Sequence, residues 1–341
     1  MVPGTAQKQQ PKALIISAFL ALYIIWGSTY LGIKYAIETI PPFFMVGISF
    51  LIAGLLLLVW CIIKRESMPS LKSIVLISFA GILMLFIGNA AVVYAEQYLP
   101  SGLVAILVAT VPLWFVVLDK SQWHFHFSNK LIIAGLLIGF AGVLMLFAGK
   151  GSIGITGSKM KIISFFVLIL GSIGWAIGSL YSKYKKTDGS TIVKVAIQML
   201  AAGIVAILTA VIINEQKGFA LSQVSRTSIL ALIYLITLGS LVAYIAYIWL
   251  LSVRPPSLVG TYAYVNPVVA VFLGWLLAGE TITTQQIIAL SIILVGVLLV
   301  NFSKEKKPEN IQPVEGRPIE LQNSQRSVTS TSLSTDSTKA E

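Results

Sequence analysis

WGSTYLGIKY, residues 26–35, recurs 149 positions later in the chain as WAIGSLYSKY, residues 175–184. Both stretches begin with tryptophan, carry a leucine five positions on and end in a lysine–tyrosine pair. The matched positions are Trp26 and Trp175, Leu31 and Leu180, Lys34 and Lys183, and Tyr35 and Tyr184. Leucine, valine and isoleucine match by chance in any apolar chain, but tryptophan and a lysine–tyrosine pair do so rarely. The chain is therefore predicted to contain an internal duplication.

The duplication extends beyond this stretch. After a slightly longer loop the offset becomes 155, which pairs Pro112 with Pro267. Near the end of each copy the offset is 154, where Gly-Val-Leu at 142–144 meets the same three residues at 296–298. Two correctly spaced prolines strengthen the prediction, because proline is uncommon within apolar runs.

The composition indicates a membrane protein. Of the 341 residues, 57% are hydrophobic and only 11% are charged, and the mean hydropathy is +0.89. Soluble domains carry about 25% charged residues. The net charge of +11 fits Lys and Arg gathered in loops at one membrane face, and it does not indicate nucleic-acid binding. The lone Cys61 excludes an intramolecular disulfide.

Ten apolar spans are expected, each long enough to cross about 30 Å of hydrocarbon as a helix. They cover residues 13–33, 42–63, 71–94, 101–119, 130–148, 160–182, 191–213, 228–250, 257–279 and 285–302. Five spans per copy is an odd number, so the second copy must insert upside down. The predicted fold class is an all-α polytopic membrane protein with ten transmembrane helices as two inverted five-helix repeats, an architecture typical of transporters.

The expected organisation follows from these spans. It comprises a cytoplasmic N-terminus (1–12), a first repeat (13–148), a connecting loop (149–159), a second repeat (160–302) and a disordered cytoplasmic tail (303–341). Lys and Arg are more frequent in the loops on the side of the termini, which predicts a multi-pass protein of the cell inner (plasma) membrane with both termini cytoplasmic. Two GxxxG patterns, Gly135/Gly139 and Gly174/Gly178, are interpreted as helix packing.

Three stretches connect the chain to a known family. They are ALYIIWGSTYLGIKYAIETIPP (21–42), TYAYVNPVVAVFLGW (261–275) and GWLLAGETIT (274–283). Over nearly all of residues 13–302 the chain resembles the EamA family of the drug/metabolite transporter (DMT) superfamily, and within it the YedA-type exporters. The resemblance implies ten helices, cytoplasmic termini and a central substrate cavity between the halves. The first half departs from the pattern with DKSQWHFHFS (119–128), so no symmetric role is expected for Glu280.

Two prolines are the predicted helix breaks, Pro112 and Pro267. Proline inside a membrane helix frees a backbone carbonyl, which neighbouring helices or water must satisfy, so such breaks occur beside cavities. A kink that serves only packing is the alternative. The surroundings of the two prolines differ, however. The stretch around Pro112, AILVATVPLW (105–114), has few polar side chains, whereas Pro267 lies in a stretch rich in polar groups.

Polar and aromatic residues inside the spans are predicted to line the substrate cavity. Tyr234, Thr237, Leu241, Tyr244 and Tyr247 recur at three- and four-residue steps, which predicts one stripe along the eighth span. Interfacial aromatic belts are the alternative, and they suit Trp60 and Trp123. The candidate cavity residues are Trp26, Tyr30, Asn89, Trp175, Ser179, Tyr244, Tyr247, Tyr262, Tyr264 and Asn266.

All carboxylates fall at span ends, in loops or in the tail, which argues against a proton relay through the core. Glu96 with Lys34 is the candidate gating or coupling pair, and a plain surface charge is the alternative. Lys183, Arg254 and Asp119 are the expected cytoplasmic counterparts.

The function predicted from the sequence is a secondary transporter working by alternating access. It is expected to export small metabolites, such as amino acids, or amphipathic drugs. A membrane-embedded enzyme and a channel are the alternatives. Catalysis is disfavoured because no HExxH motif occurs and His124 and His126 share one predicted loop. No cofactor and no metal site is expected, and the expected partners are the lipid bilayer and a small-molecule substrate, without nucleic acid, for a monomer or homodimer.

Overall fold

The computed structural model describes residues 11–99, 104, 107–147, 159–217, 219–278 and 284–302. Several predictions lie outside these residues: most of the N-terminal segment, nearly all of the connecting loop, Glu280 and the tail from residue 303. The helices belong to one compact unit that ends at Lys304.

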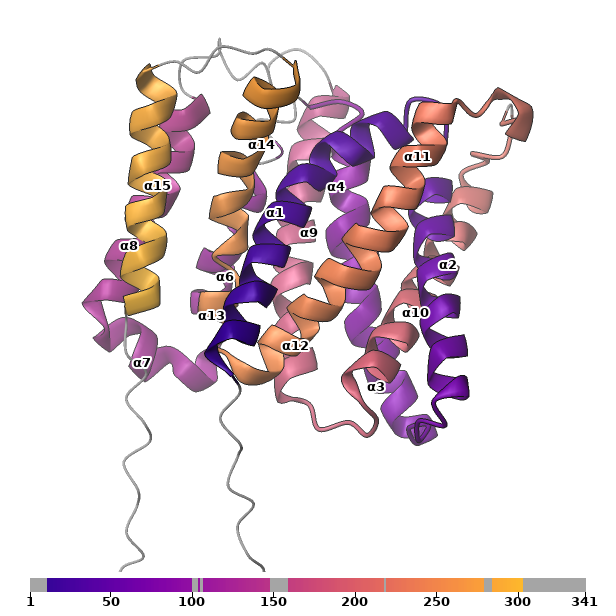
Figure 1. Cartoon of the computed structure of the whole chain (residues 1–341), viewed down its shortest axis with the longest axis horizontal. Helices are drawn as coiled ribbons and strands as arrows, with labels where there is room; N and C mark the ends of the chain where they lie inside the picture. The colour runs from indigo at the N-terminus through magenta and orange to yellow at the C-terminus, as the bar shows by residue number, and fades with distance from the viewer. Residues whose placement is uncertain are drawn as a thin grey trace, which may run out of the picture. The chain divides into compact units, whose positions relative to one another are not determined.

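The described residues form helices joined by turns and short connections, and they contain no strand (Figure 1). The elements are α1 (Lys12–Ala36), α2 (Pro42–Ile63), α3 (Leu71–Gly81), η1 (Ile82–Asn89), α4 (Ala90–Ala95), α6 (Val111–Leu118), η2 (Lys120–Gln122), α7 (Trp123–Ser128), α8 (Lys130–Phe147), α9 (Lys159–Tyr184), α10 (Thr191–Ile212), η3 (Leu221–Gln223), α11 (Arg226–Tyr234), η4 (Leu235–Tyr244), α12 (Ile245–Val253), α13 (Pro256–Val259), α14 (Tyr262–Ala278) and α15 (Thr284–Phe302).

Six of the described helical segments are long and apolar enough to cross a membrane. They are Lys12–Ala36, Pro42–Ile63, Leu71–Ala95, Lys159–Tyr184, Thr191–Ile212 and Arg226–Val253. A seventh crossing results if Lys120–Ser128 and Lys130–Met145, which meet at 91°, count as one span. The polytopic membrane class is confirmed for the described chain, and the number ten stays a prediction.

Helix starts follow ordinary capping chemistry. The side chains of Ser70, Ser190 and Ser225 accept a hydrogen bond from the backbone three residues on, at the starts of α3, α10 and α11. Pro42 opens α2, where its missing N–H costs nothing. Ser70 and Ser225 lie 155 positions apart, so the duplication includes this cap.

α2 and α10 pack antiparallel through equivalent contacts. A Cβ on Gly54 would lie 2.9 Å from Leu200 Cγ, and a Cβ on Gly203 would lie 2.9 Å from Leu51 Cγ. Both glycines and both leucines are 149 positions apart, so exchanging the two halves of the chain maps each of these contacts onto the other. Such an exchange is the mark of a two-fold relation. The numbers rise along one helix as they fall along the other, which gives the antiparallel direction.

α8 and α15 make the same kind of pair. A Cβ on Gly142 would meet Ile293, and a Cβ on Gly296 would meet Gly139, and these contacts exchange at the offset of 154. A Cβ on Gly135 would also meet Gly296, so the first GxxxG pattern lies in a close helix–helix contact, as expected. The second pattern packs against η1, with Gly174 facing Ile87.

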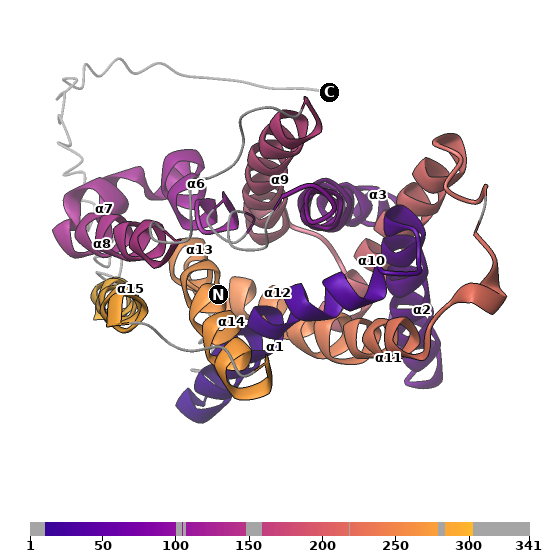
Figure 2. The same cartoon turned by 90° about the horizontal axis from the view of Figure 1, so that it is seen from above.

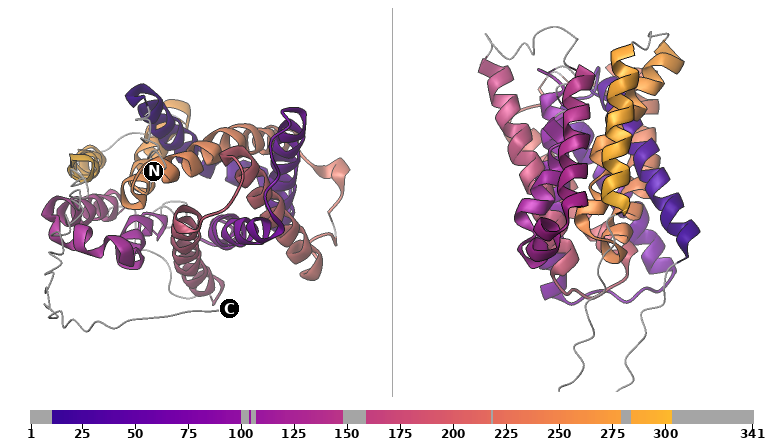
Figure 3. Two further views of the ribbon diagram at one scale, coloured as in Figure 1. Left: turned by 90° about the horizontal axis from the view of Figure 1, so that it is seen from below. Right: turned by 90° about the vertical axis from the view of Figure 1, so that its left-hand side faces the viewer.

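The remaining helices follow the duplication. α1 packs on α14, η4 and α12, while α9 packs on α6 and η1. In Figure 2 and the left view of Figure 3, α1, α12 and α14 form one row and α3, α9 and α6 the other, with α2 and α10 at one end and α8 and α15 at the opposite end. The described chain begins, in α1, and ends, in α15, on the same side of the bundle (Figure 1).

Two π-helices occupy equivalent places, η1 in the first half and η4 in the second. A π-helix bonds i to i+5, and such stretches are frequent at functional sites. The wider turn also corrects the predicted stripe of the eighth span, because residues at three- and four-residue steps no longer share a face. Thr237 is exposed and bonds its own helix at Ile233 O, whereas Tyr244 and Tyr247 are buried.

The prediction that His124 and His126 lie in a loop is wrong. Trp123–Ser128 forms the short helix α7, in which His126 is fully buried and His124 is exposed. Phe125 packs against the smaller apolar cluster around α8, α14 and α15. Burying this face gives the six residues a reason to be helical that the sequence pattern did not reveal.

Candidate functional site

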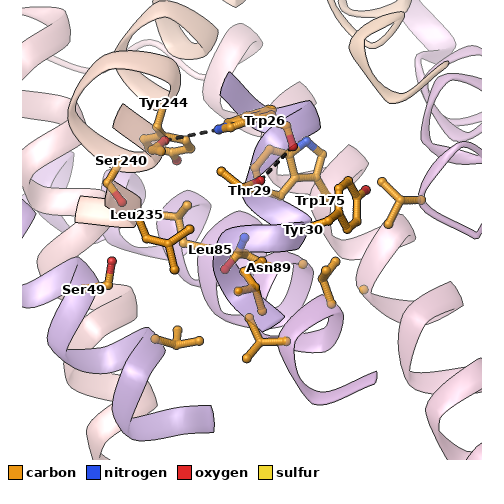
Figure 4. Close-up of a pocket in the computed structure, with 18 of the residues that line it drawn as sticks. Trp26, Thr29, Tyr30, Ser49, Leu85, Asn89, Trp175, Leu235, Ser240 and Tyr244 are labelled. Carbon is orange, nitrogen blue, oxygen red and sulfur yellow. Dashed lines mark hydrogen bonds between the residues drawn. The ribbon is translucent and has the colours of Figure 1, made fainter. Parts of the chain in front are cut away.

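A cavity lies between the two rows of helices. It holds about 930 Å³ of space not occupied by atoms, counting its open mouth. Apolar side chains from α1, α2, η1, α4, α6 and η4 form most of its wall (Figure 4). Its polar and aromatic lining residues are Trp26, Thr29, Tyr30, Ser49, Asn89, Ser172, Trp175, Ser240, Tyr244, Tyr262 and Asn266.

The cavity occupies one half of the bundle. Its α1 residues run from Trp26 to Ile33, towards the end of that helix, and its α2 residues run from Met45 to Phe50, near the start. It therefore lies on the side of the α1–α2 connection, which is the upper side in Figure 1.

Aromatic rings close the cavity towards the other side. Trp26 and Trp175 meet edge to face with ring centroids 5.4 Å apart, and Trp26 meets Tyr262 at 4.8 Å. The two tryptophans are equivalent positions of the duplication, so the halves touch here through the same residue. Tyr247 lies behind them, 5.3 Å from Trp175 and 5.8 Å from Tyr262.

Seven of the ten predicted cavity residues line this space. Ser179 and Tyr247 lie behind the wall, where Tyr247 Oη accepts from Trp175 Nε1 at 2.8 Å and bonds Ser179 Oγ at 2.6 Å. Tyr264 faces away, in the cluster around α8 and α15, and its hydroxyl donates to Leu136 O at 3.1 Å. Residues 262 and 264 point to nearly opposite sides of a helix, which is why only Tyr262 reaches the cavity.

Both predicted breaks lie beside the cavity, but they differ. Pro112 opens α6 after a turn at residues 109–110, and Val108 and Val111 on either side of that turn line the cavity. Pro267 lies inside the continuous helix α14 and is buried, directly after Asn266. Proline fits the first turn of α6, so the first break is a helix start and not a kink.

Several polar side chains interact with one another beside the cavity. Both carboxylate oxygens of Glu96 and Oδ1 of Asn266 are buried without a hydrogen-bond partner. The Tyr30 hydroxyl interacts with the side chain of Asn266 and with the charge of Glu96. Burial raises the pKa of Glu96, just outside the Leu71–Ala95 span, to about 8, while Lys34 opposes the shift.

The expected pair of Glu96 and Lys34 is not in direct contact. The Lys34 side chain is exposed, and its charge reaches the carboxylate through space. The carboxylate oxygens themselves are buried, so the alternative of a plain surface charge does not describe Glu96.

The opposite side of the bundle carries a bonded network at the equivalent positions. Lys183 Nζ donates to Leu251 O at 2.8 Å and to Arg254 O at 2.7 Å, and these are carbonyls at the end of α12. Tyr184 Oη donates to Asp119 Oδ2 at 2.7 Å. The corresponding Lys34 is exposed.

The sequence interpretation missed several lining residues: Thr29, Ser49, Ser172 and Ser240. Serine and threonine commonly bond the preceding turn of their own helix, so they do not stand out in an apolar run. Two signals could have found them. Thr29 lies three residues after Trp26 on the same face, and Ser49 is the counterpart of Gln198, which accepts from Tyr244 Oη at 2.9 Å. Among the described residues, no group of three or more metal-ligating side chains occurs.

Comparison with known proteins gives a consistent result. The sequence model of the EamA-like transporter family matches twice, at residues 13–148 and 162–302. The chain is 40% identical over 291 residues to "Uncharacterized inner membrane transporter YedA" of Escherichia coli K12, covering 85% of this chain and 91% of that protein. It is 25% identical to "Uncharacterized transporter YoaV" of Bacillus subtilis, over 86% of this chain and 98% of that one.

A protein of known crystal structure shares the fold. It superposes with a TM-score of 0.67 at 17% identity, over 85% of this chain and 96% of the other.

Proposed function

Because the chain belongs to the EamA-like transporter family, we propose that it is a secondary transporter that moves a small solute across the membrane by alternating access. We assign it ten spanning helices in two inverted repeats, residues 13–148 and 160–302. Two nearly equivalent halves have two nearly equivalent packings, one open to each side. The family relationship favours transport over catalysis.

One observation carries this proposal: equivalent residues have different contacts. Lys183 is bonded to the carbonyls of Leu251 and Arg254, which end α12. Subtracting the offset of 155 gives residues 96 and 99, so the counterpart acceptors for Lys34 are the carbonyls of Glu96 and Leu99. In the opposite conformation Lys34 donates hydrogen bonds to these two carbonyls at the end of α4, and the hydrogen bonds from Lys183 to the end of α12 are broken.

The closing contacts show the same asymmetry. The hydrogen bond between Tyr244 and Gln198 joins η4 to α10. The counterparts, Asn89 and Ser49, line the cavity as Tyr244 does, but among the described residues no hydrogen bond joins them. Residues that hold one side shut therefore have partners on the open side that would close it when the halves exchange roles.

The orientation follows from charge. The connections on the side where α1 begins carry Lys64, Arg65, Lys185 and Lys186, and we assign this side to the cytoplasm, with both termini. The cavity then faces outward and its aromatic floor faces the cell. The floor interrupts any continuous path, which favours a transporter over a channel. We propose export as the working direction.

Counterflow in proteoliposomes tests the proposal. The purified protein is reconstituted and offered radiolabelled amino acids and amphipathic amines against a trapped excess of the same solute. We expect exchange of at least one class, and loss of that exchange in Tyr262→Ala and Asn266→Ala. Liposomes without protein are the control. The proposal fails if no solute exchanges, and the site assignment fails if both variants exchange at the wild-type rate.

A further inference from the structure

Two residues with unsatisfied acceptors lie beside one cavity-lining tyrosine. Of the described residues, four have a buried side-chain polar atom without a partner: Glu96, His126, Ser164 and Asn266. Two of them, Glu96 and Asn266, act on the same tyrosine, Tyr30, which lines the cavity. A buried polar atom without a partner costs free energy, so two such residues side by side need an explanation.

The unsatisfied atoms of Glu96 and Asn266 are all acceptors. Ionised Glu96 offers two oxygens and no donor, and Asn266 Oδ1 accepts only. A ligand that completes the site must therefore bring N–H or O–H groups. Positive charge is favoured over neutral, because the Glu96 carboxylate is buried, acts on the cavity-lining Tyr30 and bonds no donor among the described residues.

The rest of the wall suits the body of such a ligand. The Trp26 ring centroid lies 5.4 Å from that of Trp175 and 4.8 Å from that of Tyr262. Aromatic faces attract cations and cover apolar groups equally well. Carboxylates and phosphates would meet the acceptor oxygens of Glu96 and Asn266 and find no arginine among the described residues of the wall.

Resting on the transport function proposed above, we propose that the cavity selects solutes with a protonated amine, whose N–H groups bond Glu96 and Asn266 beside Tyr30. The apolar or aromatic body of the solute lies against Trp26 and Trp175. Glu96 extends from the end of α4 one turn beyond Val92, which lines the cavity, so the amine enters last and lies near the mouth.

Binding of three matched probes tests this inference without transport. Phenethylamine, 2-phenylethanol and phenylacetate share one ring and differ only in the end group. Each is titrated into the purified full-length protein, and binding is followed by the fluorescence of the cavity tryptophans. We expect the amine to bind at least about ten-fold more tightly than the alcohol, since a hydrogen bond to a charged group is worth at least that factor.

Two variants remove the acceptors and two serve as comparisons. Glu96→Gln and Asn266→Leu should each weaken the amine about ten-fold or more and the alcohol by less, and retained binding of the alcohol shows that the fold is intact. Glu38→Gln removes an exposed carboxylate near the end of α1 and should change neither probe. Lys34→Gln should tighten the amine, because it removes a positive charge near Glu96.

Four results overturn the inference. They are no binding of the amine, equal binding of amine and alcohol, preference for phenylacetate, or a loss of amine affinity in Lys34→Gln as large as that in Glu96→Gln. The last result would mean that the Glu96 carboxylate acts on Lys34 and not on the amine. Selective amine binding without counterflow of any solute would refute transport alone, and counterflow that ignores the amine would refute the inference alone.

Discussion

Replacing Lys183 by methionine should change which side of the protein is open. The substitution keeps the length and apolar body of the side chain and removes the ammonium that bonds Leu251 O and Arg254 O. A hydrogen bond from a charged group contributes about 1.5–3 kcal/mol when buried. Because Lys183 is partly exposed, we take about 2–3 kcal/mol for the two together. This corresponds to a shift of about 30- to 150-fold in the equilibrium between the two conformations.

Cysteine labelling measures this shift. Cys61 is the single cysteine and is fully buried, so it provides a silent background. Ser240→Cys places a reporter on the cavity wall, and a membrane-impermeant maleimide is applied from either side. Lys183→Met should reduce labelling from the side where the cavity now opens and increase it from the side of Lys183.

Two further substitutions make the test decisive. Lys34→Met should shift labelling in the opposite direction, because Lys34 is assigned the same bonds in the opposite conformation. Lys185→Met removes an exposed lysine of the same side and should change nothing. A change of equal sign in Lys183→Met and Lys34→Met, or no change in either, would refute the reasoning from repeat equivalence.

Three other outcomes follow from the contacts. Phenethylamine affinity should rise with pH through about 8, because the Glu96 carboxyl is protonated below its raised pKa. Lys34 and Tyr30 are the groups that face this carboxyl. Titration at pH 6–9 checks the rise, and Glu96→Gln should flatten the profile. Gly81→Ala should lower stability by about 1–3 kcal/mol, since its Cβ would lie 2.5 Å from Gln198 Cα, whereas a Cβ on Gly239 has 3.4 Å of room; a melting temperature unchanged in Gly81→Ala would contradict the packing. Tyr247→Phe removes partners of two buried groups and should cost about 1–3 kcal/mol in the same melts, and equal melting temperatures for variant and parent would contradict the network.

The duplication was predictable because its marks are rare residues at fixed spacing. Tryptophan and the lysine–tyrosine pair recur at 149, and in the structure Trp26 and Trp175 meet at the centre. Asn266 was found for a similar reason: an amide deep in an apolar span must face the protein and not lipid. These inferences depend only on residue type and period, which the sequence contains in full.

Other features depend on how a helix departs from its regular form. The stripe through Thr237 failed because η4 widens to a π-helix, and nothing in the local residues marks that change. Helix α7 was missed because its stability comes from burying His126 and Phe125 against distant elements. The unequal contacts of Lys34 and Lys183 were also beyond prediction, since the sequence does not show which side of the bundle is closed.

The differences between equivalent positions indicate how one scaffold can carry a selective site. Tyr30 and Ser179 are counterparts, yet the first lies on the cavity wall against the acceptors and the second is locked behind it by Tyr247. Exchanging the two packings would bring Ser179, not a tyrosine, to the equivalent place. Glu96 likewise corresponds to Leu251, which has no charge to offer. A solute amine would therefore find its acceptors only on the side of Glu96, so its affinity should fall as the halves exchange, and this asymmetry ties selectivity to one of the two conformations.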